Sequence, residues 1–197
     1  LQVYDLTSDQ VVLSPFTAEL AGASVRLIVC DARHLLVADP SLFYVYNNEA
    51  RETTRIRSSG CLSLSHGCVS LAADTLAFID RQDPTIIRLV DPLTGRALKH
   101  KVRHKCEVVS VALEHTGSHA TRKLALIDKG KDLFICQLAR PSALRKIASA
   151  VDSFAWSESV AVISYTTGGS LATNVMPAAP FLDTDLESQV IVRSRAE

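Results

Sequence analysis

The chain has 197 residues, 47% of them hydrophobic, and its 21 lysines and arginines balance its 21 aspartates and glutamates. This hydrophobic content is enough to build a core and excludes a disordered chain. The zero formal charge gives no overall attraction to nucleic acid or to an anionic membrane. No apolar run approaches the roughly 20 residues of a membrane-spanning helix, so we expect neither nucleic-acid binding nor membrane insertion.

Short apolar or alternating stretches, each bounded by turn residues, predict strands along most of the chain. Four pairs of them are expected to form hairpins, at 34–46, 76–91, 124–138 and 160–176. The other expected strands are 1–5, 25–30, 51–57, 67–71, 107–113, 143–148, 151–156 and 189–193. Residues 51–57 alternate polar and apolar side chains, so we expect them to be an exposed outer strand, and residues 143–148 are expected to be another outer strand.

The first strands of the four hairpins, which we interpret as the inner strands of the blades, resemble one another, with the sequences LLVAD, LAFID, LALID and VAVIS. Their final residues, Asp39, Asp80, Asp128 and Ser164, are spaced by 41, 48 and 36 residues. A nearly continuous apolar run suits a strand that is buried on both faces, and a repeat of this length suits a propeller blade. An irregular β-sandwich is the alternative, but it does not predict this self-similarity.

Residues 89–111, LVDPLTGRALKHKVRHKCEVVSV, show how one repeat joins the next. Asp91 is expected to end a strand by accepting backbone N–H groups, and Gly95 to supply the positive φ of a Thr-Gly turn. A short edge strand, His104 and an alternating strand follow, which is typical of a WD-repeat joint. The sequence therefore predicts an all-β fold, a WD-repeat β-propeller that is incomplete in this chain, with about four blades plus flanking strands.

We expect residues 1–197 to be part of a longer protein, with blade joints near residues 5, 47, 91, 138 and 176. The chain begins within an expected strand and has no initiator Met. Propellers usually have four to eight blades, so the missing blades are expected to precede Leu1. The repeat pattern weakens after residue 176, where two prolines interrupt strand pairing.

Two groups of neighbouring residues contain side chains that zinc binds: His100, His104 and Cys106, and then His115 and His119. These residues lie in expected loops and strand starts and not on a helix or zinc knuckle, and structural zinc needs four ligands. We therefore expect no metal, and assign His104 to the WD-repeat position where a histidine bonds neighbouring backbone or a carboxylate.

The remaining polar candidates are also expected to be structural. Asp80, Asp128 and Asp132 resemble paired acids, but turn capping explains their places at strand ends. Trp156 is expected to anchor packing. The basic run Lys99–Lys105 is interpreted as a solvated loop, with contact to phosphate or to an acidic partner as the alternative. Five cysteines without a Cys-x-x-Cys pair predict buried free thiols in a reducing compartment: Cys30, Cys61, Cys68, Cys106 and Cys136.

Sequence motifs for catalysis or cofactor binding are missing. There is no Gly-x-Ser-x-Gly element and no phosphate-binding Gly-x-x-x-x-Gly-Lys loop. We therefore predict no catalytic, cofactor-binding or metal-ligating residues, no cofactor, and no enzymatic activity.

Several phrases, in a fixed order, carry a resemblance to one family. They are VSLAADTLAFIDRQDPTIIRLVDPLTGRAL, HKCEVVSVALEHTG, RKLALIDKGKDLFI and VDSFAWSE, followed by VMPAAPFLDTDL and QVIVRSRA. Together they resemble the second β-propeller of the intraflagellar transport protein 80 family, over about residues 68–186 and more thinly over 1–65. Residues 160–176 depart from the family, because they lack its aromatic Trp-Tyr.

The resemblance implies a structural subunit of intraflagellar transport complex B, with two propellers followed by a helical solenoid. Its implied partners are other complex B subunits, with self-association through regions outside this chain left open. Its implied locations are the cilium or flagellum, the axoneme and basal body, and the cytoplasm. A subunit of another coat or vesicle-trafficking complex remains an alternative. So does a propeller with a ligand site at its central channel, although the expected inner strands begin with apolar residues.

Overall fold

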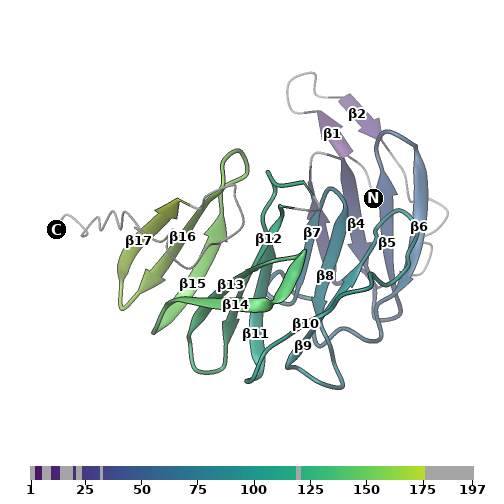
Figure 1. Ribbon diagram of the computed structural model, residues 1–197. Helices are drawn as coiled ribbons and strands as arrows, with labels where there is room; N and C mark the ends of the chain where they lie inside the picture. The colour runs from purple at the N-terminus through teal and green to yellow at the C-terminus, as the bar shows by residue number, and fades with distance from the viewer. Residues whose placement is uncertain are drawn as a thin grey trace.

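The computed structural model describes residues 3–5, 10–13, 20, 24–31, 33–118 and 121–175. These residues form four antiparallel sheets and one separate two-stranded hairpin. The sheets stand next to one another in chain order and make an open arc (Figure 1). None of the described residues forms a helix with the length and apolar character needed to cross a membrane.

Each four-stranded sheet is a meander whose neighbouring strands follow one another in sequence. Sheet I contains β3 (Leu27–Cys30), β4 (His34–Ala38), β5 (Leu42–Asn47) and β6 (Glu52–Arg57). Sheet II contains β7 (Val69–Ala72), β8 (Thr75–Ile79), β9 (Ile86–Val90) and β10 (Val102–Arg103). Sheet III contains β11 (Val108–Leu113), β12 (Lys123–Asp128), β13 (Leu133–Gln137) and β14 (Arg140–Ala148). Sheet IV contains β15 (Val151–Trp156), β16 (Val162–Thr167) and β17 (Ser170–Val175), and the separate hairpin pairs β1 (Val3–Asp5) with β2 (Gln10–Leu13).

The first strand of each sheet lies nearest the first strand of the next, because β3 contacts β7, β7 contacts β11, and β11 contacts β15. These strands are therefore the innermost strands of the arc. The segments LLVAD, LAFID and LALID, expected from sequence to be inner strands, are instead the second strands, β4, β8 and β12.

The apolar runs are explained by burial from both sides. Every residue of β4, β8 and β12 is buried, because each of these strands lies in the middle of a sheet that packs against its neighbours. The outer strands β6 and β14 are mostly exposed or half-buried, and the exposure predicted for residues 51–57 is confirmed at β6. The expected all-β propeller architecture is thereby confirmed.

Neighbouring sheets are also joined by hydrogen bonds. Between sheets II and III, the Val111 backbone N–H donates to the Gly67 carbonyl at 2.8 Å, and the Leu113 N–H donates to Ser70 Oγ at 2.9 Å. Between sheets III and IV, Trp156 Nε1 donates to the carbonyl oxygen of Ala112 at 3.2 Å. The expected role of Trp156 in packing is confirmed, since its ring is buried in the core shared by β12, β13, β15 and β16.

A buried charged cluster lies at the boundary of sheets II and III. Lys123 Nζ is 3.2 Å from Glu114 Oε2, and both side chains are almost fully buried. Arg122, also buried, donates from Nε to Asp74 Oδ1 at 2.9 Å and from its guanidinium to the Glu114 carbonyl. The cluster therefore pairs each buried cation with an acceptor, as burial of a charge requires.

The Thr-Gly joint has the expected conformation. Gly95 has a φ of +69°, and a Cβ there would meet Ile56 and Thr54 of sheet I at 3.4 and 3.5 Å. Asp91 Oδ1 accepts the Leu93 N–H, and Asp91 Oδ2 accepts the Thr94 hydroxyl, both at 2.8 Å. The strand expected at 189–193 and the prolines after residue 176 lie outside the described residues.

We predict that Trp156→Ala lowers the free energy of unfolding by about 3–5 kcal/mol, because it empties a buried aromatic site between two sheets. Trp156→Phe keeps most of the packing and loses the hydrogen bond to Ala112, so its cost should be nearer 1 kcal/mol. Denaturant unfolding followed by circular dichroism measures both values. An unchanged stability for Trp156→Ala would contradict the packing role.

Candidate functional site

An aspartate follows or ends the second strand of sheets I, II and III and caps the next turn. Asp39 Oδ1 accepts the Ser41 N–H at 2.8 Å, and Asp80 Oδ1 accepts the Gln82 N–H at 2.8 Å. Asp128 Oδ1 accepts the N–H of Asp132 at 3.0 Å. The capping role predicted for Asp80 and Asp128 is confirmed, whereas the Asp132 carboxylate instead pairs with Lys146 of β14.

The second oxygen of each capping aspartate has a different partner in each sheet. Asp39 Oδ2 accepts the hydroxyl of Tyr44 at 3.3 Å, and Asp80 Oδ2 accepts Nε of Arg88. Asp128 Oδ2 is 3.0 Å from His104 Nε2. One backbone role is thus conserved between sheets while its side-chain partner changes.

Sheet IV does not continue the series where the sequence repeat placed it. Ser164 was expected to end a strand, but β16 continues to Thr167. Strand register gives the reason: Val108 faces Asp128 in sheet III, and Val151 faces Thr167 in sheet IV. The residue equivalent to Asp128 is therefore Thr167. The alignment of VAVIS with the other apolar segments had placed the end of the repeat at Ser164, three residues too early.

The capping bonds also change the acidity of Asp39. Burial opposes its ionisation, but the Ser41 hydroxyl, the N–H groups of Ser41 and Leu42, and the Tyr44 hydroxyl all bond the carboxylate. These hydrogen bonds outweigh burial and lower the pKa of Asp39 below its ordinary value of 3.8. Asp39 is therefore held as a carboxylate, which suits a cap and not a proton donor.

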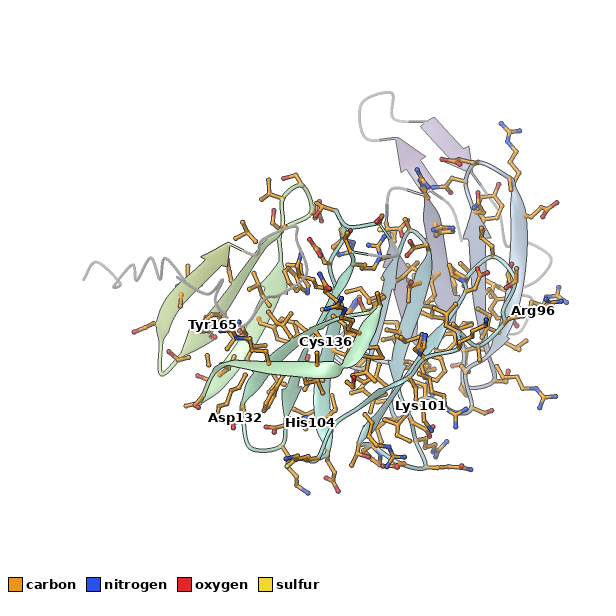
Figure 2. All side chains as sticks on the ribbon, in the orientation of Figure 1. Arg96, Lys101, His104, Asp132, Cys136 and Tyr165 are labelled. Atoms are coloured by element: carbon orange, nitrogen blue, oxygen red, sulfur yellow. The ribbon has the colours of Figure 1, made fainter. Side chains whose placement is uncertain are left out.

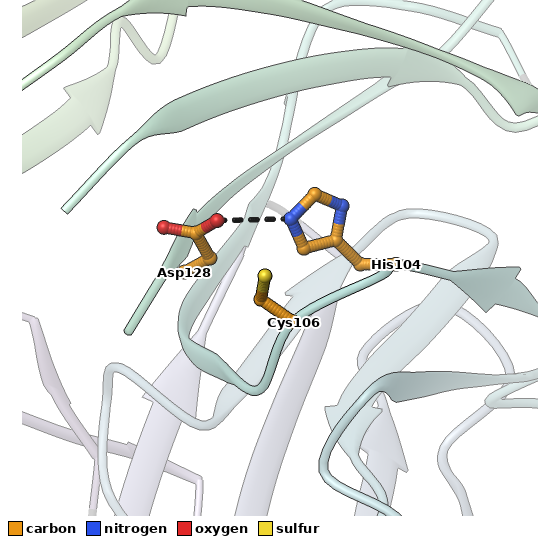
Figure 3. A group of neighbouring side chains, drawn as sticks. All are labelled: His104, Cys106 and Asp128. Atoms are coloured by element: carbon orange, nitrogen blue, oxygen red, sulfur yellow. Dashed lines mark hydrogen bonds and ion pairs between the residues drawn. The ribbon is translucent and has the colours of Figure 1, made fainter. Parts of the chain in front are cut away.

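His104, Cys106 and Asp128 come together beside β12 and β13 (Figure 3). The side chains of His104 and Asp128 are only 8% and 5% exposed, and the His104 ring lies 4.4 Å from the ring of Phe134, centre to centre. Cys106 is exposed. As predicted for the WD-repeat histidine, His104 bonds a carboxylate: it follows β10 of sheet II, and its partner is Asp128 at the turn of sheet III.

The same three residues are a candidate group of metal ligands, since one ligand atom from each lies within 4.8 Å of the others. Three protein donors are fewer than a structural zinc site uses, and the hydrogen bond between His104 and Asp128 already accounts for two of them. Of the other histidines considered, His100 and His115 lie in separate hollows, and His119 lies outside the described residues. That the chain holds no metal remains a prediction.

Sequence reasoning missed a cavity of about 860 Å³ where the turns after the first strands of the sheets converge. Its polar lining comes from all four sheets: Cys30, Asp31, Arg33, Asp74, His115, Arg122 and Glu158. The missed signal is a charged residue or histidine within three residues after each first strand. The apolar residues that the sequence shows at the starts of the expected inner strands belong to the second strands β4, β8 and β12, and so do not bear on this cavity.

Several charged groups around this cavity serve the turns themselves. Asp31 Oδ1 accepts the N–H groups of Arg33 and His34, both at 2.7 Å. Arg122 is bonded to Asp74, and Arg33 is 3.6 Å from Glu49. These contacts give the charged groups of the cavity wall a structural role.

The sequence predicts that the cysteines are buried, which is confirmed for three of them and wrong for two. Cys61, Cys68 and Cys136 are buried, whereas Cys30 and Cys106 are exposed at strand ends and loops. Burial raises the pKa of Cys136 to about 12 and that of Cys61 to about 11, so both are held as inert thiols.

With this geometry established, comparison with known proteins decides the family. The family described as the IFT80 second β-propeller matches residues 2–197. The chain belongs to this family. It is 29% identical over 180 residues to the intraflagellar transport protein 80 homolog of Rattus norvegicus and 28% identical to that of Mus musculus. Each alignment covers 88% of this chain and 23% of the relative, so the chain spans about a quarter of the length of these relatives.

Solved structures resemble this family member in fold alone. Kluyveromyces lactis Hsv2 aligns with a TM-score of 0.59 at 12% sequence identity, covering 95% of this chain and 60% of that one. U3-55K aligns with a TM-score of 0.56 at 17% identity, covering 86% of this chain and 51% of that one.

We predict that His104→Ala lowers the free energy of unfolding by about 1–3 kcal/mol, because it leaves the buried Asp128 oxygen without its partner. His100→Ala is the matched control, since His100 is exposed and should change stability by less than about 0.5 kcal/mol. Urea unfolding of both variants at neutral pH makes the comparison. Equal stabilities for the two variants would contradict the role of His104.

The lowered pKa of Asp39 predicts how stability depends on pH. Its carboxylate stabilises the fold above the unfolded value of 3.8, and this contribution is lost as pH falls through the lower folded value. Asp39→Asn should therefore cost about 1–3 kcal/mol at neutral pH and should make stability fall less steeply below about pH 4. Glu52→Gln, on exposed β6, is the control, and parallel pH profiles for wild type and Asp39→Asn would reject the assignment.

Proposed function

We propose that this chain is part of the second propeller of a longer, non-catalytic scaffold subunit of intraflagellar transport complex B. The observation that carries the proposal is the family match over residues 2–197. The similarity to the two intraflagellar transport protein 80 homologs supports it. The subunit would serve transport along the axoneme and the assembly of cilia or flagella.

The contacts of the polar residues support a scaffold more than an enzyme. The turn aspartates are used as caps, His104 bonds one of them, and Arg122 joins two sheets. A propeller binds partners through broad rims and edges, which need no catalytic group. This arrangement suits a protein whose exposed turns and outer strands bind other subunits.

Under this proposal the chain carries blade joints near residues 5, 47, 91, 138 and 176, and further blades and helical repeats lie elsewhere in the polypeptide. Its partners are other complex B subunits. Its locations are the cilium or flagellum, with the axoneme and basal body, and the cytoplasm. Self-association would use regions outside this chain.

We predict that the full-length polypeptide, tagged and recovered from flagellated cells, co-purifies with axonemal transport subunits. Mass spectrometry of the recovered proteins makes the measurement, and a tagged unrelated propeller is the control. Recovery of vesicle-coat proteins without transport subunits would reject the proposal in favour of the trafficking alternative.

A further inference from the structure

A groove of about 610 Å³ runs between the outer parts of sheets I and II. One wall is β6, the other is β9, and residues 95–101, which lead from β9 to β10, close one side. We call it the cationic groove. Neither the family nor the proposed role assigns anything to it.

The floor of the cationic groove is apolar and fixed in place. Ile56, Phe78 and Leu89 line it and are buried members of the main core. The Phe78 ring lies 5.6 Å from that of Phe43 in the neighbouring sheet, centre to centre. Such a floor keeps its shape without a ligand, so a bound chain would lose little binding energy to ordering it.

The walls carry an excess of positive charge. Five cationic residues line the groove: Arg55, Arg57, Arg88, Lys99 and Lys101. All five are exposed, and Asp80, which is the one carboxylate among the described residues of the lining, is paired with Arg88. In a chain with equal numbers of acidic and basic residues, this is a local concentration of charge and not a general property.

The cations continue beyond the groove along the edge of sheet II. Lys101 also lines a neighbouring hollow with Arg103 and Lys105, where Asp83 is 3.6 Å from Arg103. Figure 2 labels Lys101 in the lower part of the molecule, in the region where Figure 1 labels β9 and β10. The positive surface is therefore extended, which suits a chain and not a single small anion.

The outer strand of sheet II is unusually short at this place. β10 has 2 residues, whereas β6 has 6 and β14 has 9. It pairs with β9 at Val102 and Arg103, and a separate bridge joins Ala97 to Val90. Residues 99–101, between these contacts, hold exposed Lys99, His100 and Lys101, so the break in the strand coincides with the cationic segment.

We propose that the cationic groove binds an extended acidic segment of a partner protein. Carboxylates of that segment would face Arg57, Lys99 and Lys101, and its alternate apolar side chains would rest on the floor. Complementary charge favours this partner. Among the described lining residues, Phe78 is the one phenylalanine, tyrosine or tryptophan, and it is buried, so the groove lacks the exposed large aromatic rings on which nucleic-acid bases commonly stack. The inference rests on the proposed scaffold function and names the chemistry of one of its partners.

The test uses the full-length polypeptide and a fluorescein-labelled peptide of alternating glutamate and leucine. Fluorescence anisotropy should show binding that weakens as salt is added, because the contact is between exposed charges. A peptide of alternating lysine and leucine should not bind. Lys99→Glu with Lys101→Glu should weaken acidic-peptide binding at least about tenfold, since it places like charges opposite one another.

Two matched variants distinguish binding in the groove from attraction to the net charge of the protein. Arg26→Glu with Arg51→Glu makes the same change of charge at exposed residues outside the groove and should leave peptide affinity within about twofold. Lys99→Arg with Lys101→Arg keeps the charge and should bind like wild type. Thermal unfolding of each variant checks that all are folded.

Other results would overturn the proposal. An equal loss in the Arg26 and Arg51 variant would show attraction to net charge alone, and binding of a single-stranded RNA in place of the peptide would identify a different partner. If wild type recovers transport subunits from cells but does not bind the peptide, the groove proposal fails while the scaffold function stands. If it recovers none, the scaffold function itself fails.

Discussion

The whole fold depends on one constraint: in sheets I, II and III the second strand is buried on both faces, and none of these sheets can cover its second strand alone. β4, β8 and β12 are buried throughout, and each depends on side chains from the sheets next to it. Stacking of repeats satisfies this requirement, because every added sheet covers its neighbour. The hydrogen bonds from Val111 to Gly67 and from Trp156 to Ala112 then fix how adjacent sheets meet.

The same constraint explains what the sequence could predict. A strand that is buried on both faces has a nearly continuous apolar sequence. The segments LLVAD, LAFID and LALID therefore allowed both these strands and their repetition along the chain to be predicted. The position of a strand within its sheet leaves no such mark, and these segments proved to be second strands. Hydrophobicity also cannot fix register, so Ser164 was placed where pairing puts Thr167.

The polar groups divide in a similar way. Turn caps follow from local chemistry, because Asp39, Asp80 and Asp128 bond backbone only a few residues away. The cavity at the converging turns and the cationic groove join residues from different sheets, and sequence separation hides such neighbours. The sequence analysis interprets Lys99–Lys105 as a solvated loop, and the groove that Lys99 and Lys101 share with Arg57 could not be read from the chain, because Arg57 lies more than 40 residues away.

The buried pair of Glu114 and Lys123 restricts how this sequence can change over time. If one partner is replaced alone, the other charge stays buried and unpaired, which lowers the free energy of unfolding by about 3–5 kcal/mol. This loss is a large part of the stability of an ordinary domain. Replacing both by apolar residues of similar volume can be neutral. Substitutions at these two positions are therefore expected to occur together, so that related sequences should show either both charges or neither.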